Sequence, residues 1–87
     1  MRGRVMAINL DVFVVKLGDD SYSIVELPPI TDISDVYKEH DVALFDEIQG
    51  DLFAEGATEL RNITQNKTLN VVIKKSHATK YDLASVL

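Results

Sequence analysis

The chain has 87 residues and a net charge of −5 at pH 7, with 9 basic side chains, 14 acidic side chains and no cysteine. This length predicts one domain, and the missing cysteines exclude disulfides, thiolate metal sites and a cysteine nucleophile. The longest apolar run is VFVV at 12–15 and no signal-peptide pattern opens the chain, so we expect a cytoplasmic protein without a membrane span.

The charge is distributed unevenly along the chain. Residues 1–60 hold 4 basic and 13 acidic side chains, a net charge of −9, whereas residues 61–87 hold 5 basic and 1 acidic, a net charge of +4. An acidic surface repels a phosphate backbone, so only the last third of the chain is suited to attract a nucleic acid.

Three strands are predicted in the first part of the chain, at 4–9, 12–17 and 21–27. In the first strand Val5 and Ile8 are three residues apart, so a bulge is needed to place both on the core side. The second and third strands flank GDD at 18–20, a pattern typical of a hairpin. Phe13 is expected in the core, and both faces of the hairpin are partly apolar, which suits a closed barrel.

The middle of the chain is predicted to be a loop followed by a strand. Pro28-Pro29 ends the third strand, because proline cannot donate to a central ladder. We expect at most a short helix within 31–38. A fourth strand is predicted at 41–48, where Val42, Leu44, Asp46 and Ile48 alternate.

The last third is predicted to begin with a second hairpin. Its strands lie at 58–64 and 68–75, on either side of QNK. Three side chains of the second strand are expected to face the core, namely Leu69, Val71 and Ile73.

In the C-terminal tail, the spacing of the apolar residues changes from that of a strand to that of a helix. Leu83, Val86 and Leu87 lie at i, i+3 and i+4, which places them on one face of a helix. Thr79 with Asp82 resembles a capping box. We therefore expect a barrel domain at 1–76 and a tail at 77–87 that forms a short helix.

The strand pattern predicts an all-β fold, a small antiparallel barrel of five to six strands with a short C-terminal helical tail. The stretch DVALFDEIQGDL at 41–52 resembles the element hydrophobic-x-hydrophobic-Gly-Asp-x-hydrophobic-x-Gly of OB-fold and SH3-like small barrels. Phe45 occupies the place where glycine is usual, so we expect a wider turn or a longer strand there.

The order of elements over residues 3–73 also resembles that of short single-barrel bacterial proteins of unassigned function. The pieces that carry this resemblance are GRV at 3–5, DSY at 20–22, EL at 26–27, DEIQGDL at 46–52 and LRNIT at 60–64. The resemblance implies an OB-fold-like topology, with an SH3-like topology as the alternative. OB-fold relatives often bind single-stranded nucleic acid, which makes that activity an expectation by analogy.

The acidic stretch FDEIQGDLFAEG at 45–56 raises the question of a cation site. A calcium loop needs oxygen ligands at alternate positions and glycine at the sixth, and counting from Asp46 the sixth position is Asp51. We expect instead a strand that ends in a turn, with Asp46 and Asp51 both accepting backbone N–H groups in the turn around Gly50. His40 and His77 lie in predicted loops and are expected to be solvated, so no metal site is predicted.

No catalytic motif occurs in the chain, so we expect neither an enzyme nor a cofactor. The leading hypothesis is a non-catalytic interaction module that binds a protein partner or itself through Leu83, Val86 and Leu87. The alternative is a single-stranded nucleic-acid-binding module that uses the basic residues of the last third. These residues are Arg61, Lys67, Lys74, Lys75 and Lys80, and a competing interpretation is that they guard a strand edge.

Overall fold

The structure is a computed structural model that describes residues 1–9, 11–27 and 42–84. Its described part contains six strands and one short helix. In chain order they are β1 (Arg2–Asn9), β2 (Val12–Leu17), β3 (Tyr22–Glu26), β4 (Glu47–Gln49), β5 (Gly56–Asn62), β6 (Lys67–Ala78) and α1 (Lys80–Ala84).

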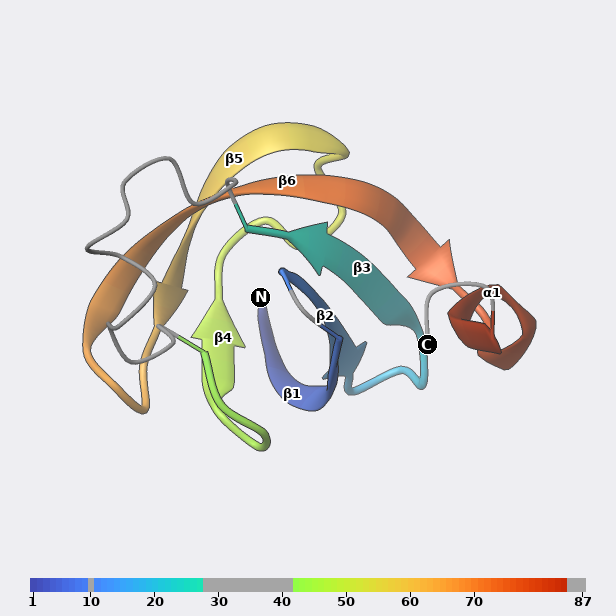
Figure 1. The fold of residues 1–87 in the computed structure, drawn as a ribbon, viewed down its shortest axis with the longest axis horizontal. Helices are drawn as coiled ribbons and strands as arrows, with labels where there is room; N and C mark the ends of the chain where they lie inside the picture. The colour runs from blue at the N-terminus through green and yellow to red at the C-terminus, as the bar shows by residue number, and fades with distance from the viewer. Residues whose placement is uncertain (10, 28–41, 85–87) are drawn as a thin grey trace.

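The six strands form a closed barrel in the order β1-β2-β3-β6-β5-β4, and every neighbouring pair is antiparallel. Figure 1 shows the curved β6 running between β3 and β5, with α1 at its C-terminal end. The barrel consists of two meanders, β1-β2-β3 and β4-β5-β6, which meet where β1 pairs with β4 and β3 pairs with β6. The predicted antiparallel barrel with a short C-terminal helix is therefore confirmed.

The core lies inside the barrel and draws on every strand. Phe13, from β2, is 1% exposed, as predicted. Buried residues of the cluster are Val5, Phe13, Val15, Leu17, Val25, Val42, Ile48, Leu52, Leu60, Leu69, Val71 and Ile73. Val14 and Ile24 are buried outside this cluster, so both faces of the β2–β3 hairpin are covered. No helix within the described ranges has the length and hydropathy to cross a membrane.

The predicted bulge in β1 is present, but it does not do what we expected of it. The register between β1 and β2 shifts between Val5 and Ala7. Val5 is fully buried, whereas Ile8 is 37% exposed, so the expectation that the bulge brings both residues to the core is wrong.

The strand predicted at 41–48 is mostly wrong, because β4 begins only at Glu47. The preceding residues form a tight turn in which the Asp46 N–H donates to the Ala43 carbonyl at 3.2 Å. The Asp46 carboxylate accepts the Ala43 N–H at 2.9 Å and closes the same turn from its other side. Phe45 adopts φ 72°, the left-handed conformation that glycine favours, so the turn is not widened.

The second hairpin is present, with its strands displaced from the prediction. β5 begins and ends two residues earlier than predicted, and a turn at 63–66 precedes β6. β6 continues to Ala78, beyond position 76, where we expected the barrel to end. Register shifts opposite Ile24 bend β6 around the barrel. β5 pairs only as far as Ile73, so the last part of β6 has one partner strand, β3.

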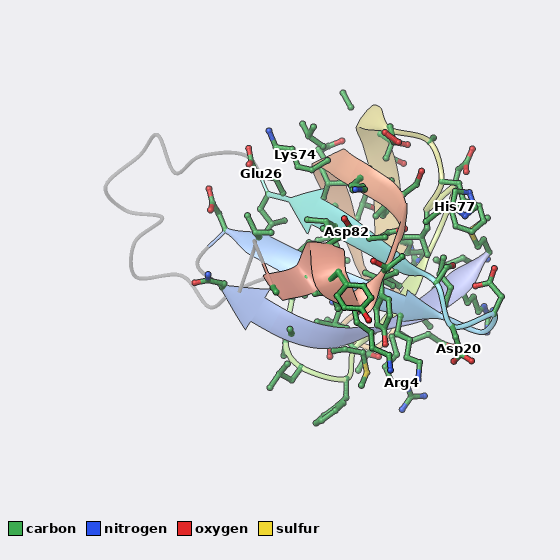
Figure 2. All side chains as sticks on the ribbon, turned by 90° about the vertical axis from the view of Figure 1, so that its right-hand side faces the viewer. Arg4, Asp20, Glu26, Lys74, His77 and Asp82 are labelled. Carbon is green, nitrogen blue, oxygen red and sulfur yellow. The ribbon has the colours of Figure 1, made fainter. Side chains whose placement is uncertain are left out.

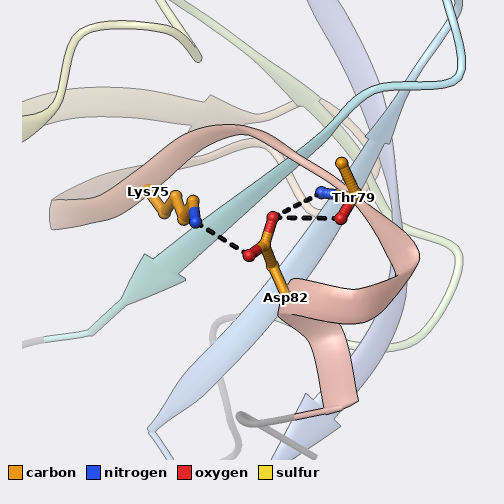
Figure 3. Close-up of polar contacts among 3 residues, drawn as sticks. All are labelled: Lys75, Thr79 and Asp82. Atoms are coloured by element: carbon orange, nitrogen blue, oxygen red, sulfur yellow. Dashed lines mark hydrogen bonds and ion pairs between the residues drawn. The ribbon is translucent and has the colours of Figure 1, made fainter.

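The helix predicted in the tail is present as α1, which contacts β6. Asp82 Oδ2 accepts the Thr79 backbone N–H at 2.8 Å and the Thr79 hydroxyl at 3.2 Å, the expected capping arrangement. Asp82 Oδ1 lies 2.8 Å from Lys75 Nζ and ties the helix to β6 (Figure 3). The possible helix within 31–38 lies outside the described residues.

Deleting residues 79–87 is expected to leave the barrel folded and to lower its melting temperature by only about 5 °C. α1 has no buried residue, and its link to β6 is an exposed ion pair, which contributes little to stability. The truncation should also abolish any self-association that uses the predicted apolar face of the tail. Thermal unfolding and sedimentation of both chains measure these effects. A truncated chain that is unfolded at room temperature contradicts the prediction.

Candidate functional site

The tail predicted as an interaction face is only partly described. Leu83 is half-buried on α1, and Val86 and Leu87 lie outside the described residues. The apolar face of these three residues therefore stays a prediction.

The basic residues predicted as a nucleic-acid surface are dispersed over β5, β6 and α1, and several are already paired. Lys74 Nζ lies 3.5 Å from Glu26 Oε2, and Lys75 pairs with Asp82. Arg61 donates to the side-chain oxygen of Asn66. Lys74 and Lys75 lie where β6 has lost its β5 partner, a position that favours the interpretation as edge guards. Lys67 begins β6, and Lys80 begins α1.

Asp46 and Asp51 both accept backbone N–H groups, but only Asp51 does so beside Gly50, because Asp46 holds the earlier turn at 43–46. Asp46 is buried, and its Oδ2 accepts three hydrogen bonds, from the Ala43 N–H, from Asn62 Nδ2 at 2.8 Å and from Gln65 Nε2 at 2.7 Å. Asp51 Oδ1 accepts the Phe53 N–H at 3.3 Å. Over the described residues, no group of three His, Cys, Asp or Glu side chains is arranged to hold a metal ion.

Asp46 remains charged in spite of its burial. Burial acts to raise the pKa of Asp46, but the hydrogen bonds from Asn62, Ala43 and Gln65 together lower that pKa below its usual value. Asn62 is itself fully buried, and its Oδ1 accepts the Gln65 backbone N–H at 3.1 Å. The carboxylate thus fixes the turn before β4 to the turn between β5 and β6.

This buried network supports an exposed apolar surface that the sequence analysis missed. Phe45 is 61% exposed, Leu44 is 51% exposed and Met6 is 42% exposed. The Phe45 N–H donates to the Val5 carbonyl at 2.7 Å, so the turn lies directly beside Met6 on the β1 bulge. We call Met6, Leu44 and Phe45 the Phe45 face.

A shallow groove of about 330 Å³ borders the Phe45 face. Its lining includes the three basic residues Arg2, Arg4 and Lys16, together with Gly3, Met6 and Glu47. Arg4 stands opposite Lys16 on one side of β1 and opposite Glu47 on the other. Met6 belongs to both surfaces and joins them. We call this feature the basic groove.

The chain matches no protein-family model, no curated protein and no solved structure. The role of these surfaces therefore follows from their chemistry alone. The alternation of Arg2, Arg4 and Met6 at the start of the chain was the signal available in the sequence. It marks one outward strand face that is both basic and apolar.

A second, more polar pocket of about 690 Å³ lies between the β2–β3 turn and α1. The His77 ring lines it and stacks on Phe53, with ring centroids 3.9 Å apart. His77 is exposed, as expected, but it lies in β6 rather than in a loop, while His40 lies outside the described residues. Two hydrogen bonds from Ser21, from its hydroxyl and its N–H, lower the pKa of the exposed Asp19 in this pocket. Its acidic and basic side chains give the pocket no single ligand preference.

Proposed function

We propose that the protein is a non-catalytic interaction module that binds a protein partner through the Phe45 face. The observation that carries this proposal is the conformation of Phe45, a large aromatic residue that is 61% exposed at φ 72°. Large side chains rarely adopt this conformation, which costs about 1–2 kcal/mol relative to a right-handed one.

An exposed phenylalanine in this conformation stabilises the fold less than a buried phenylalanine would. Glycine would adopt the same φ without the cost, and a polar residue would avoid exposing an aromatic ring to water. Backbone strain of this kind persists where the surrounding structure enforces it, and it is concentrated at functional sites. Here the hydrogen bonds of Asp46 and of the Phe45 N–H enforce it.

Exposed aromatic and methionine side chains next to arginine are the composition that marks protein interfaces. The nucleic-acid alternative has less support, because several residues expected to carry it are already paired within the chain. A closed barrel of six strands is also larger than the five-stranded, partly open OB-fold. The relationship to OB-fold and SH3-like barrels remains a resemblance, and a cytoplasmic location remains a prediction.

The proposal is tested by photo-crosslinking in cells, with p-benzoylphenylalanine placed at position 45. The substitute is itself a large aromatic residue, so it preserves the character of the face. We expect a discrete protein adduct that disappears when Leu44→Asp is added. Tyr81 provides the matched control, because it is an aromatic residue on α1 that is 89% exposed.

Absence of any adduct from position 45, or the same adducts from positions 45 and 81, overturns the proposal. An adduct with the mass of two copies of this chain identifies the partner as the protein itself. Persistence of the adduct after Leu44→Asp places the contact away from the Phe45 face and also overturns the proposal.

A further inference from the structure

We infer that the segment bound at the Phe45 face is an acidic peptide that carries a large apolar side chain, and that its carboxylates enter the basic groove. This inference rests on the proposed function and specifies the chemical class of its partner. The observations that support it are the charges of the groove, the position of the groove beside Phe45 and the charge of the rest of the molecule.

The basic groove concentrates positive charge in an acidic protein. Arg2, Arg4 and Lys16 line it, although the chain as a whole carries −5. Arg4 and Lys16 are cross-strand partners, and like charges placed directly opposite each other destabilise a sheet. Arg2 has Glu47 at 3.8 Å and Lys16 has Asp20 at 3.6 Å, whereas Arg4 has no ion-pair partner among the described residues. Glu47 stands opposite Arg4 on the other side of β1 but pairs with Arg2, so a further carboxylate from outside would relieve this repulsion.

The apolar surface begins where the groove ends. The backbone hydrogen bond from Phe45 reaches Val5, the residue between Arg4 and Met6. Arg2 to Met6 spans about 13 Å of strand, which an extended peptide covers with roughly four or five residues. Such a peptide can place carboxylates over Arg2 and Arg4 and an apolar side chain against Met6 and Phe45.

The charge distribution favours this peptide over an anionic membrane or a nucleic acid. A membrane or a polyanion presents negative charge over a wide area, so it meets the net negative charge of the whole molecule as well as the groove. Glu47 also lies inside the groove, where it opposes a continuous row of phosphates. A short peptide contacts only the local positive charge.

The test uses panels of synthetic peptides of about nine residues against the isotope-labelled full chain. The first panel combines Asp and Glu with one Phe, Trp or Leu. The second replaces the acidic residues by Lys, and the third replaces the apolar residue by Ala. We expect the first panel alone to give saturable NMR shifts at Arg2–Met6, Lys16 and 44–47. Raising the salt from about 50 to about 500 mM should weaken this binding.

Two substitutions separate the contributions of charge and apolar contact. Arg4→Glu should weaken binding of the acidic–apolar peptide about tenfold, and Phe45→Ala should weaken it roughly tenfold to a hundredfold. Lys74→Glu makes the same change of charge elsewhere, since Figure 2 shows Lys74 and Arg4 on opposite sides of the molecule. Lys74→Glu should therefore leave the affinity unchanged.

Several results overturn the inference. One is that the first panel does not bind, or that the lysine panel binds as tightly as the first. Another is an Arg4→Glu variant that binds the peptide as tightly as the wild type does. A third is tighter binding to anionic lipid vesicles or to single-stranded oligonucleotides than to any peptide. If the peptides fail while position 45 still crosslinks a discrete protein, the acidic class is wrong and the proposed function stands. If both fail, the proposed function is wrong as well.

Discussion

Replacing Asp46 by alanine is expected to lower the free energy of unfolding by about 3 kcal/mol, and the melting temperature by roughly 12–24 °C. The substitution removes the single oxygen that accepts hydrogen bonds from Ala43, Asn62 and Gln65. Asn62 is fully buried, and a hydrogen bond to a charged acceptor contributes about 1.5–3 kcal/mol. Denaturant unfolding measures the loss.

The matched control is Asp51→Ala, five positions along the same acidic stretch. Asp51 is exposed and accepts one long hydrogen bond, so its loss should change stability by no more than about 0.5 kcal/mol. Equal effects of the two substitutions would show that the buried network does not hold the turn.

The same carboxylate makes the stability depend on pH. Because its pKa is lowered in the folded state, Asp46 stabilises the protein fully above the unfolded-state pKa of roughly 3.9. This contribution is lost as the pH falls through the lower folded-state pKa. Asp46→Asn keeps an acceptor oxygen but cannot titrate, so its stability should vary less than that of the wild type below about pH 4. Parallel pH profiles of the two proteins would contradict this assignment.

Replacing Gly3 by alanine is expected to cost about 3 kcal/mol, at the upper end of the range for overpacking. An added Cβ would clash with Val15 Cγ1 and would lie 2.8 Å from the Lys16 carbonyl oxygen. Side chains can rotate away, but that carbonyl belongs to the backbone of β2, beside which β1 runs. Gly3 also pairs with Ile48 of β4, so a displacement of β1 disturbs the barrel on both sides.

Gly18→Ala is the control for this substitution. Nothing lies within 4 Å of a Cβ at Gly18, so alanine should leave stability unchanged or raise it by about 0.4–1 kcal/mol. Chemical denaturation of the two variants measures the difference. If Gly3→Ala is as stable as Gly18→Ala, β1 and β2 are less closely packed than described.

The first hairpin was predictable because its signals are local. Two β-rich runs on either side of GDD specify it, and β2 and β3 match the prediction closely. The turn found in place of most of the predicted strand at 41–48 could not be predicted in this way. Its residues Val42, Leu44, Asp46 and Ile48 alternate in sequence as they would in a strand. What overrides the alternation is the pairing of Asp46 with Asn62 and Gln65, which are distant in sequence.

The candidate site was hidden for a related reason. Arg2 and Arg4 lie in the part of the chain with a charge of −9, so a count along the sequence concealed them. The register between β1 and β2 brings Lys16 opposite Arg4, and no local pattern specifies that register. Phe45 was noted as an unusual residue at a glycine position, but its conformation and exposure depend on the folded barrel.

The shortness of β4 determines where the barrel closes. β4 has 3 residues, and among the described residues it is the one strand that pairs with both β1 and β5 (Figure 1). Such a short junction between distant parts of the chain is expected to form late in folding and to open first, because closing a long loop costs entropy before few contacts repay it. The Phe45 face and the basic groove both lie across this junction. The Phe45 face is complete only once β1 has paired with β4, so a bound partner would favour the closed barrel over an opened one.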